Sequence, residues 1–337
     1  MITNMDKEKE LKSEIINTGK KLYDLRLVAA KSGNLSARVE GDVILITASG
    51  TCLGQLKEED ILKVHLSDFA SVSQKGLSSE FPLHSMIYKN FPVEKIIHCH
   101  PPLINAYYAV NNSLENITFE SKLFLGEVPV ISQNTPNIRE PEKAIEALKL
   151  NNIIVIKNHG AVSIANKFDE AFYLIEELEE TVKIAAIARL FAKKDCGIFE
   201  KELSKNLIEN QKPCDMFSKE HISKIVDLLN QDEDFSSKAI EPELTTKVAI
   251  KMTAEKEVVY KFDFQKGKIS KLEFDDDAPF VISGAPEVWK LVFEGKIDPF
   301  VASTQGKLKL KGDMAKLALW YAAFSRMFFL FRQIKIK

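Results

Sequence analysis

The sequence predicts an α/β domain followed by a smaller α+β domain. In the first two-thirds of the chain, short β-branched runs alternate with amphipathic helical patterns, which is typical of α/β architecture. A polar stretch containing Gly197 and Pro213 then precedes a group of strand-like segments, which indicates a linker and a second domain. The length of 337 residues is about twice that of a typical domain. We therefore expect domains at 1–196 and 217–337, joined by a linker at 197–216.

The first domain is expected to begin with an amphipathic helix at 7–31, because its leucine and isoleucine residues follow helical spacing. Three apolar runs rich in β-branched residues predict buried strands. These runs lie at Val43–Thr47, 95–100 and Ile153–Ile156, and Pro101 and Gly160 break the chain after the last two. A long helix at 168–194, acidic in its first half and basic at its end, closes the domain.

The second domain is expected to hold one helix, four strands and a closing apolar helix. The expected bounds are 219–229 for the first helix, 246–251, 258–264, 268–274 and 307–311 for the strands, and 314–331 for the closing helix. Residues between Lys316 and Arg326 are uncharged and mainly apolar, so this helix fills a core, docks on another subunit or contacts lipid. The excess of basic residues after residue 306 leaves a contact with an anionic membrane surface open.

The composition is that of a soluble, folded protein. Hydrophobic residues make up 45% and charged residues 28% of the chain, which excludes a disordered polymer. The formal net charge of -2 gives no reason to expect a nucleic-acid partner. The charged N-terminus does not match a signal peptide, and no apolar run has the roughly 18 residues that a membrane span needs. The four cysteines contain no CxxC pair, so we expect free thiols and a cytoplasmic location.

Two histidines on a predicted strand and one in a later loop form a candidate metal site. His98 and His100 lie two residues apart, so an extended strand points both imidazoles to one face and Cys99 to the other. His159 follows another buried strand, in a loop that contains Gly160, and loops gather functional groups. Three histidines with one open position suit a catalytic zinc ion. The alternative is three separate histidines that each hydrogen-bond elsewhere.

A second group of motifs suits an anion. Ser78, Ser79 and Glu80 precede an expected helix, with Ser79 as its N-cap, and the N–H groups of a first helical turn favour an anion. Glu80 is a candidate metal ligand or general base, or else only an acidic residue that the helix dipole favours. Glycine turns at 32–36 and 47–50 can present N–H and hydroxyl groups to a phosphate, or serve only as tight turns.

Five motifs in this order resemble the class II aldolase/adducin family. They are Ser-Gly-Asn-Leu-Ser at 32–36, Thr-Ala-Ser-Gly at 47–50, Ser-Ser-Glu at 78–80, His-Cys-His at 98–100 and Asn-His-Gly at 158–160. The resemblance implies a three-layer α/β domain with a central, mainly antiparallel sheet. It implies zinc or another divalent ion on His98, His100 and His159, with Glu80 as a further ligand that also acts as acid and base. The implied phosphate-binding residues are Gly33, Asn34, Ser49, Gly50, Ser78 and Ser79.

The same resemblance implies a lyase of carbohydrate metabolism that cleaves a small ketose phosphate to dihydroxyacetone phosphate and an aldehyde. The metal stabilises the negative charge formed when the carbon–carbon bond breaks, and Glu80 moves protons. A homotetramer with sites between its subunits is also implied. The complete ligand set argues against the non-catalytic adducin branch. Epimerase, dehydratase and decarboxylase activities stay open, because Phe119 stands near the place of the family's tyrosine proton donor, while Tyr107 and Tyr108 are closer to the histidines.

The second domain resembles the sterol carrier protein fold. The segment 305–313, followed by the apolar closing helix, carries the resemblance, and so does the pattern at 282–289 that enters a helix. The resemblance implies a five-stranded sheet and helices around a tunnel for a lipid or fatty acyl ligand. A lipid-carrying scaffold with a relic metal site is therefore the rival hypothesis, and no stable membrane insertion is expected.

Overall fold

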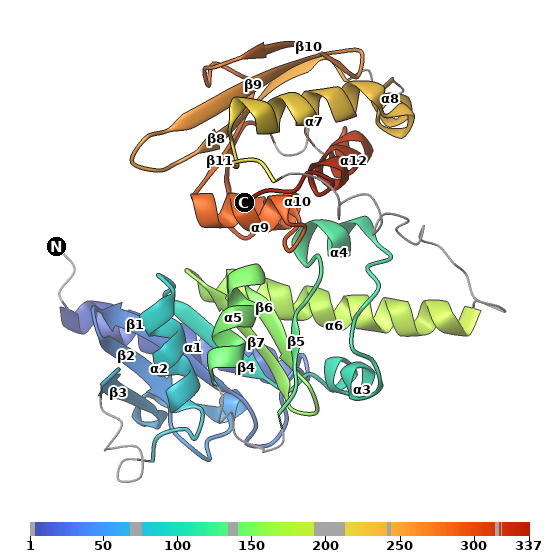
Figure 1. Cartoon of the computed structure of the whole chain (residues 1–337). Coiled ribbons are helices and arrows are strands. Elements are labelled where there is room, and N and C mark those ends of the chain that lie inside the picture. Colours follow the sequence, from blue (N-terminus) through green and yellow to red (C-terminus); the bar gives the residue numbers. More distant parts are fainter. Residues whose placement is uncertain are drawn as a thin grey trace. The chain divides into compact units, whose positions relative to one another are not determined.

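The computed structural model describes residues 4–67, 76–133, 141–191, 213–240, 244–313, 317 and 319–337. The chain divides into two compact units, unit 1 at Met1–Asp195 and unit 2 at Cys196–Lys337 (Figure 1). Residues 197–212 of the expected linker lie outside the described residues. Its last part lies within unit 2, where Cys214 forms a parallel bridge with Ile336. Within the described ranges, no helix has both the length and the apolar character needed to cross a membrane.

Unit 1 is a seven-stranded sheet with helices on both faces. Its helices are α1 (Asn4–Asp24), α2 (Phe81–Asn90), α3 (Pro102–Val110), α4 (Phe119–Phe124), α5 (Pro141–Leu150) and α6 (Phe168–Phe191), with short 3-10 turns at Leu53–Gln55 and Glu58–Asp60. Its strands are β1 (Asn34–Glu40), β2 (Val43–Thr47), β3 (Ile61–His65), β4 (Lys95–Cys99), β5 (Val130–Ile131), β6 (Ile153–Ile156) and β7 (Gly160–Ala165). The order is β3-β2-β1-β4-β7-β6-β5, and only the β5–β6 pair is parallel. The predicted three-layer, mainly antiparallel architecture is confirmed.

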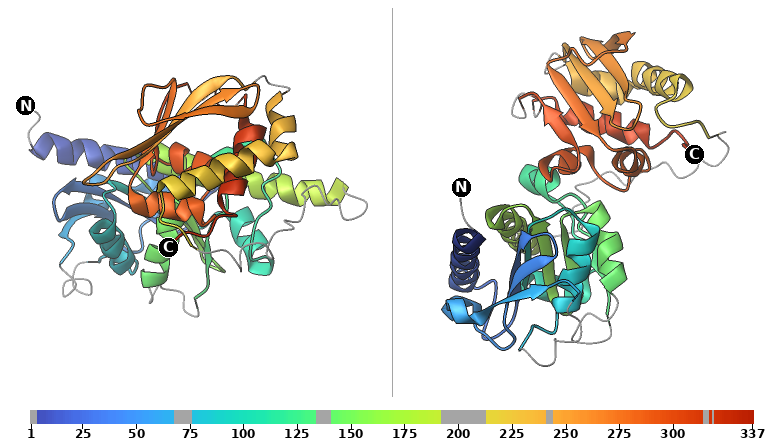
Figure 2. Two further views of the ribbon diagram at one scale, coloured as in Figure 1. Left: turned by 45° about the horizontal axis from the view of Figure 1, so that its top comes forward. Right: turned by 90° about the vertical axis from the view of Figure 1, so that its left-hand side faces the viewer.

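Alternate side chains of the sheet enter two separate cores. Leu35 on β1 and Cys99 on β4 pack with α1, α3 and α6 on one face. Ile96 on β4 packs with α2 and α5 on the other face. Figure 2 shows α1 and the pair α2 and α5 on opposite sides of the sheet. Because neighbouring strand residues point to opposite faces, Asn34 and His98 lie on the α2 face.

Two boundaries in unit 1 differ from the sequence prediction. The opening helix, expected to reach residue 31, ends at Asp24, because Arg26 and Ala30 adopt φ values of 60° and 52° that a right-handed helix excludes. The chain was also expected to leave the sheet at Gly160. Instead β7 begins there and pairs with both β4 and β6, because a residue without a side chain can lie directly against the backbone of Cys99.

Unit 2 is a five-stranded sheet packed by helices. Its helices are α7 (Lys219–Gln231), α8 (Glu233–Ile240), α9 (Pro286–Phe293), α10 (Pro299–Thr304) and α12 (Tyr321–Phe331). Its strands are β8 (Thr246–Met252), β9 (Val258–Gln265), β10 (Lys268–Glu273), β11 (Phe280–Gly284) and β12 (Lys309–Lys311), in the order β10-β9-β8-β11-β12. The sequence analysis did not predict β11, which pairs parallel with β8.

The apolar C-terminal helix of unit 2 is shorter than the expected 314–331. Residues 314–316 and 318 lie outside the described residues, and Leu319 and Trp320 form a turn, so α12 begins at Tyr321. Its buried face holds Phe324, Phe328 and other apolar residues, and Arg326 forms an ion pair with Asp232 at 2.7 Å. The described part of this helix therefore packs into its own unit.

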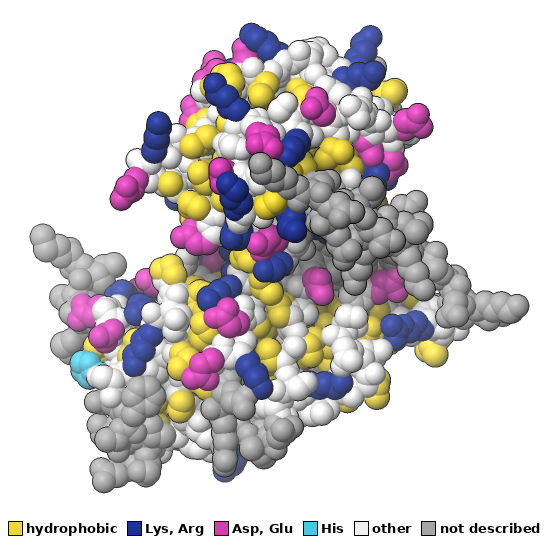
Figure 3. Space-filling view, in the orientation of Figure 1, with side chains coloured by type: hydrophobic (Ala, Val, Ile, Leu, Met, Phe, Trp, Pro, Cys, Tyr) yellow, Lys and Arg dark blue, Asp and Glu magenta, His cyan; other side chains and the backbone are white. Residues whose placement is uncertain are grey.

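The exposed surface carries charges of both signs. Figure 3 shows acidic and basic side chains interspersed on the visible face, without a large area of one sign. This pattern agrees with the formal net charge of -2. It matches no basic footprint of the kind that a nucleic-acid partner requires.

Buried His221 makes the stability of unit 2 depend on pH. Its Nδ1 accepts a hydrogen bond from Phe217 N–H at 3.2 Å, and burial lowers the pKa of His221 from 6.5 to about 4. Between these two pH values, the unfolded chain binds a proton that the folded chain does not, so stability falls as the pH falls.

We expect His221→Asn, which keeps an acceptor for Phe217 and removes the titrating ring, to flatten this dependence. The wild type should lose stability relative to the variant as the pH falls from 6.5 to 4, by at most about 1.4 kcal/mol per pH unit. Both tryptophans, Trp289 and Trp320, lie in unit 2, so urea unfolding followed by tryptophan fluorescence measures the effect. Parallel pH profiles for the two proteins would contradict the prediction.

Candidate metal centre

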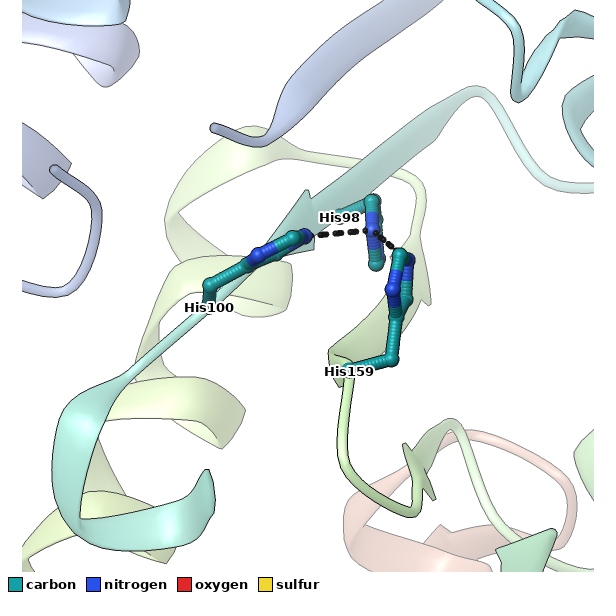
Figure 4. Close-up of side chains that lie close together, drawn as sticks. All are labelled: His98, His100 and His159. Atoms are coloured by element: carbon teal, nitrogen blue, oxygen red, sulfur yellow. Dashed lines mark hydrogen bonds between the residues drawn. The ribbon is translucent and has the colours of Figure 1, made fainter. Parts of the chain in front are cut away.

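Three imidazoles converge at the end of the two central strands of unit 1. His98 is the fourth residue of β4, His100 follows its last residue, and His159 directly precedes β7. The Nε2 atom of His98 lies 3.0 Å from Nε2 of His159 and 3.0 Å from Nε2 of His100. Figure 4 shows the three rings turned toward one another. Among the described residues, these three form the group whose ligand atoms all lie within 4.8 Å of one another.

The hydrogen bonds of His98 leave its Nε2 lone pair pointing into this cluster. Its Nδ1 lies 3.1 Å from Ala161 O, which can only accept, so Nδ1 carries the proton. Nε2 is then an acceptor with nitrogens from two other rings at 3.0 Å. A tetrahedral zinc with Zn–N bonds of about 2.05 Å separates its nitrogen ligands by roughly 3.3 Å. The donor set and spacing therefore fit a single divalent ion.

Burial keeps the cluster neutral, which is the form that binds a metal. Desolvation lowers the pKa of His98 well below 6.5, and the neighbouring histidines lower it further. Desolvation, followed by the charge of His159, lowers the pKa of His100 to about 4. The pKa of His159 is also lowered by burial. Protons therefore compete weakly for these nitrogens at neutral pH.

Two further contacts fix the strand ends that carry the ligands. Glu179 on α6 accepts hydrogen bonds from the N–H groups of Leu103 and Ile104, at 3.0 and 2.9 Å, and so fixes the start of α3 just after His100. Asn105 on α3 donates from Nδ2 to His159 O at 3.2 Å. One short helix thus connects the segment of His100 with the loop of His159. The sequence analysis missed both residues, because neither belongs to a motif.

Glu80 lies beside the cluster at the start of α2. Its Oε1 is 3.9 Å from Nε2 of His159, and the side chain is 4% exposed. The N-cap of α2 is Glu80 itself, so the expectation that Ser79 caps this helix is wrong. The helix starts one residue later than a Ser79 cap would require, and it is Ser78 Oγ that accepts from Glu80 N–H at 3.2 Å.

The three segments expected to hold a phosphate meet near one another. The N–H of Leu35, next to Asn34, donates to Thr47 Oγ1 at 3.1 Å, which connects the turns at 32–36 and 47–50. Ser49 N–H donates to Gly76 O at 2.7 Å, and Ala48 forms a bridge with Leu77. Gly33 and Gly50 have positive φ values, and Gly50, Ser49 and Ser79 are exposed, whereas Asn34 and Ser78 are buried.

The helix end at this place offers fewer donors than the sequence suggested. Phe81 N–H is used by Ser78 O at 3.0 Å, and Pro82 has no N–H. An anion here must therefore be held in part by side chains and by the turns, and Asn34 and Ser78 are the buried polar candidates.

Residues 13–186, about half of the chain, match the family model described as Class II Aldolase and Adducin N-terminal domain. The chain belongs to this family. Residues 227–324 also match the model of the SCP-2 sterol transfer family, in agreement with the resemblance noted in the sequence.

Curated relatives and a solved structure resemble unit 1 of this class II aldolase family member. The L-fuculose phosphate aldolase of Methanocaldococcus jannaschii is 33% identical over 184 residues, which is 54% of this chain and 99% of the relative. The 3-oxo-tetronate 4-phosphate decarboxylase of Pectobacterium atrosepticum is 28% identical, over 55% of this chain and 87% of the relative. The crystal structure of l-fuculose-1-phosphate aldolase from Thermus thermophilus aligns with a TM-score of 0.50 and 29% identity, over 54% and 95% of the two chains.

The aromatic residues considered as proton donors lie in different surroundings in this family member. Phe119, the first residue of α4, is 68% exposed and has no group that can donate a proton. Tyr107 donates to Ser113 O at 3.2 Å and contacts Arg189. Tyr108 is fully buried, and its hydroxyl has no partner among the described residues. None of these three is hydrogen-bonded to the histidine cluster in the described structure.

Gly160→Ala is expected to weaken metal binding. A Cβ at this position would lie 2.3 Å from Cys99 O and 2.9 Å from His100 Cδ2, so β4 and β7 must move apart and separate His100 from His159. We expect at least about a tenfold loss of affinity, measured by competition with a chromogenic chelator, because metal sites respond to small losses of orientation. Gly41→Ala, whose Cβ meets nothing within 4 Å, controls for general backbone strain. Equal affinities in the two variants would contradict this account.

Proposed function

We propose that the protein is a divalent-metal-dependent lyase that cleaves a small ketose phosphate to dihydroxyacetone phosphate and an aldehyde. The observation that carries the proposal is the convergence of His98, His100 and His159 with buried Glu80 beside them. The family membership and the phosphorylated substrates in the relatives' names support it.

The proposal gives each group of residues one task. The three histidines hold the ion, zinc or a similar divalent metal, which when bound stabilises negative charge at the carbon–carbon bond being cleaved. Glu80 takes up and returns protons at the substrate. Asn34, Ser78 and the turns that contain Gly33, Ser49, Gly50 and Ser79 hold the phosphate. Burial of His98 and Glu80 limits the access of water to the reacting atoms.

The test is a cleavage assay on the full chain loaded with zinc, manganese or cobalt. L-fuculose 1-phosphate and related ketose phosphates are the substrates, and coupled reduction of dihydroxyacetone phosphate by NADH is the readout. We expect activity that a chelator removes and added metal restores. A metal-loaded protein that releases no dihydroxyacetone phosphate from any ketose phosphate would refute the proposal.

Decarboxylation of a phosphorylated 3-oxo acid is a second candidate, favoured by the similarity to the 3-oxo-tetronate 4-phosphate decarboxylase. Both reactions break a carbon–carbon bond and leave negative charge on the phosphate-bearing fragment. An assay with 3-oxo-tetronate 4-phosphate separates them, because only decarboxylation releases carbon dioxide.

We also propose that unit 2 holds an apolar ligand such as a fatty acyl chain. A small apolar cavity supports this, lined by residues of β8, β11, α10 and α12 that include Val248, Ile282, Phe300 and Phe324. Mass spectrometry of an organic extract of the purified protein should detect a retained lipid. Its absence, together with no uptake of a fluorescent fatty acid, would contradict this part of the proposal.

A further inference from the structure

A chain of polar side chains crosses the α2 core beside the metal centre. The Tyr88 hydroxyl lies 2.9 Å from Ser36 Oγ, and Ser36 Oγ lies 2.6 Å from Nδ1 of His84. Nε2 of His84 lies 2.6 Å from Oδ1 of Asn34. All four residues are buried, with His84 and Ser36 at 0% exposure. The sequence analysis singled out only Asn34, and the proposed chemistry uses none of the other three.

The donors in this chain have one direction. Oδ1 of Asn34 can only accept, so Nε2 of His84 donates to it. In the neutral ring Nδ1 is then an acceptor, and the Ser36 hydroxyl donates to it. Tyr88 has two acceptors in reach, Ser36 Oγ at 2.9 Å and Glu94 O at 3.3 Å, and the shorter distance favours donation to Ser36. Burial, which lowers the pKa of His84 to about 3, supports the neutral ring.

This direction determines what Asn34 presents to the site. Its Oδ1 is used by His84, and its Nδ2 has no acceptor among the described residues. Asn34 on β1 is paired with His98 on β4, and directly opposed residues of antiparallel strands have their side chains on the same face. The two N–H donors of the carboxamide are therefore left for a ligand on the face that carries His98.

We propose that His84, held by Ser36 and Tyr88, is a positioning residue that fixes the Asn34 carboxamide with its amino group toward the phosphate of the substrate. The inference rests on the proposed function for the identity of that anion. A reversed carboxamide would present Oδ1, an acceptor, to the phosphate and would repel it. His84 touches neither substrate nor metal in this arrangement, so its effect is on phosphate affinity.

Two substitutions of His84 test the inference on the zinc-loaded full chain. His84→Leu removes the donor to Asn34, and we expect the affinity for inorganic phosphate, measured by calorimetric titration, to fall about tenfold. His84→Gln can donate from its Nε2 in the same place, and we expect it to bind phosphate within about twofold of wild type. Metal content should be unchanged in both. Ser163→Ala removes another buried hydroxyl hydrogen bond, from β7 to Ala171 O on the opposite face of the sheet, and should have no effect.

The direction of the chain is tested separately by the tautomer of His84. Two-bond ¹H–¹⁵N correlation spectra of histidine-labelled wild-type protein, assigned with His84→Gln, distinguish the ring protonated at Nε2 from that protonated at Nδ1. We expect Nε2–H. This measurement uses only the wild-type fold, so it decides the matter even if His84→Leu does not fold.

The outcomes separate the inference from the proposed function. Nδ1–H at His84, unchanged phosphate affinity in a folded His84→Leu protein, or no phosphate binding by the wild type would overturn the inference. Expected tautomer and affinities in a protein that cleaves no ketose phosphate would instead contradict only the lyase proposal.

Discussion

His98→Ala is expected to leave the protein without a bound metal ion. His98 is the common neighbour of the other two imidazoles, and its Nε2 is 3.0 Å from each of their Nε2 atoms. Its removal leaves two ligands, too few to hold a divalent ion tightly in this site. Elemental analysis of protein purified without chelators should give about one ion per chain for wild type and essentially none for the variant. Lyase activity should disappear with the ion.

The control for this experiment is His65→Ala, which removes an exposed histidine on β3 of the same sheet. It should keep its metal. His100→Ala, at a less buried position, serves as a second test if the buried His98→Ala variant folds poorly, which circular dichroism will reveal. A full metal complement in a folded His98→Ala or His100→Ala protein would show that the ion, if any, binds elsewhere.

Glu80→Gln is expected to retain the metal and to lose catalysis. The amide keeps the size of the buried side chain and leaves all three histidines in place, but it cannot take up a proton. Loss of a positioned acid or base typically reduces the rate about 10²–10⁴-fold, and we expect a fall in kcat of this size. The measurement is kcat under saturating ketose phosphate, with metal content determined on the same samples.

The matched control is Glu142→Gln, an exposed glutamate in the first turn of α5. It should leave kcat unchanged. A Glu80→Gln protein with wild-type kcat would exclude Glu80 as the proton-transfer group. Loss of metal in this variant would instead show that the carboxylate, 3.9 Å from His159 Nε2, mainly serves as a ligand.

The convergence of the histidines could be predicted from the sequence because its geometry follows from strand periodicity. Alternation on an extended strand places His98 and His100 on one face, and the structure brings their Nε2 atoms to 3.0 Å. The strand-like character of the runs that became β2, β4 and β6 is equally local, because β-branched residues indicate it directly.

Other parts could not be predicted, because they depend on contacts between distant segments. Gly160 has the composition of a breaker, and only the carbonyl of Cys99 opposite shows why it starts a strand. His84 carries no motif signal, and its role depends on two residues of β1, about 50 positions earlier. Helix ends failed where single residues adopt positive φ, as Arg26 does after α1, since no local pattern marked them.

The position of the ligands on β4 and β7 has a consequence for the order of folding. His98 and His159 are 61 residues apart, and closing a loop of that length disfavours their contact by roughly 4 kcal/mol before any strand pairing compensates. An unfolded chain can offer an ion only the adjacent His98 and His100. The third ligand arrives when β4 and β7 form their ladder, so metal capture follows assembly of the sheet. Protein refolded in a chelator should therefore regain its sheet first and accept the ion afterwards.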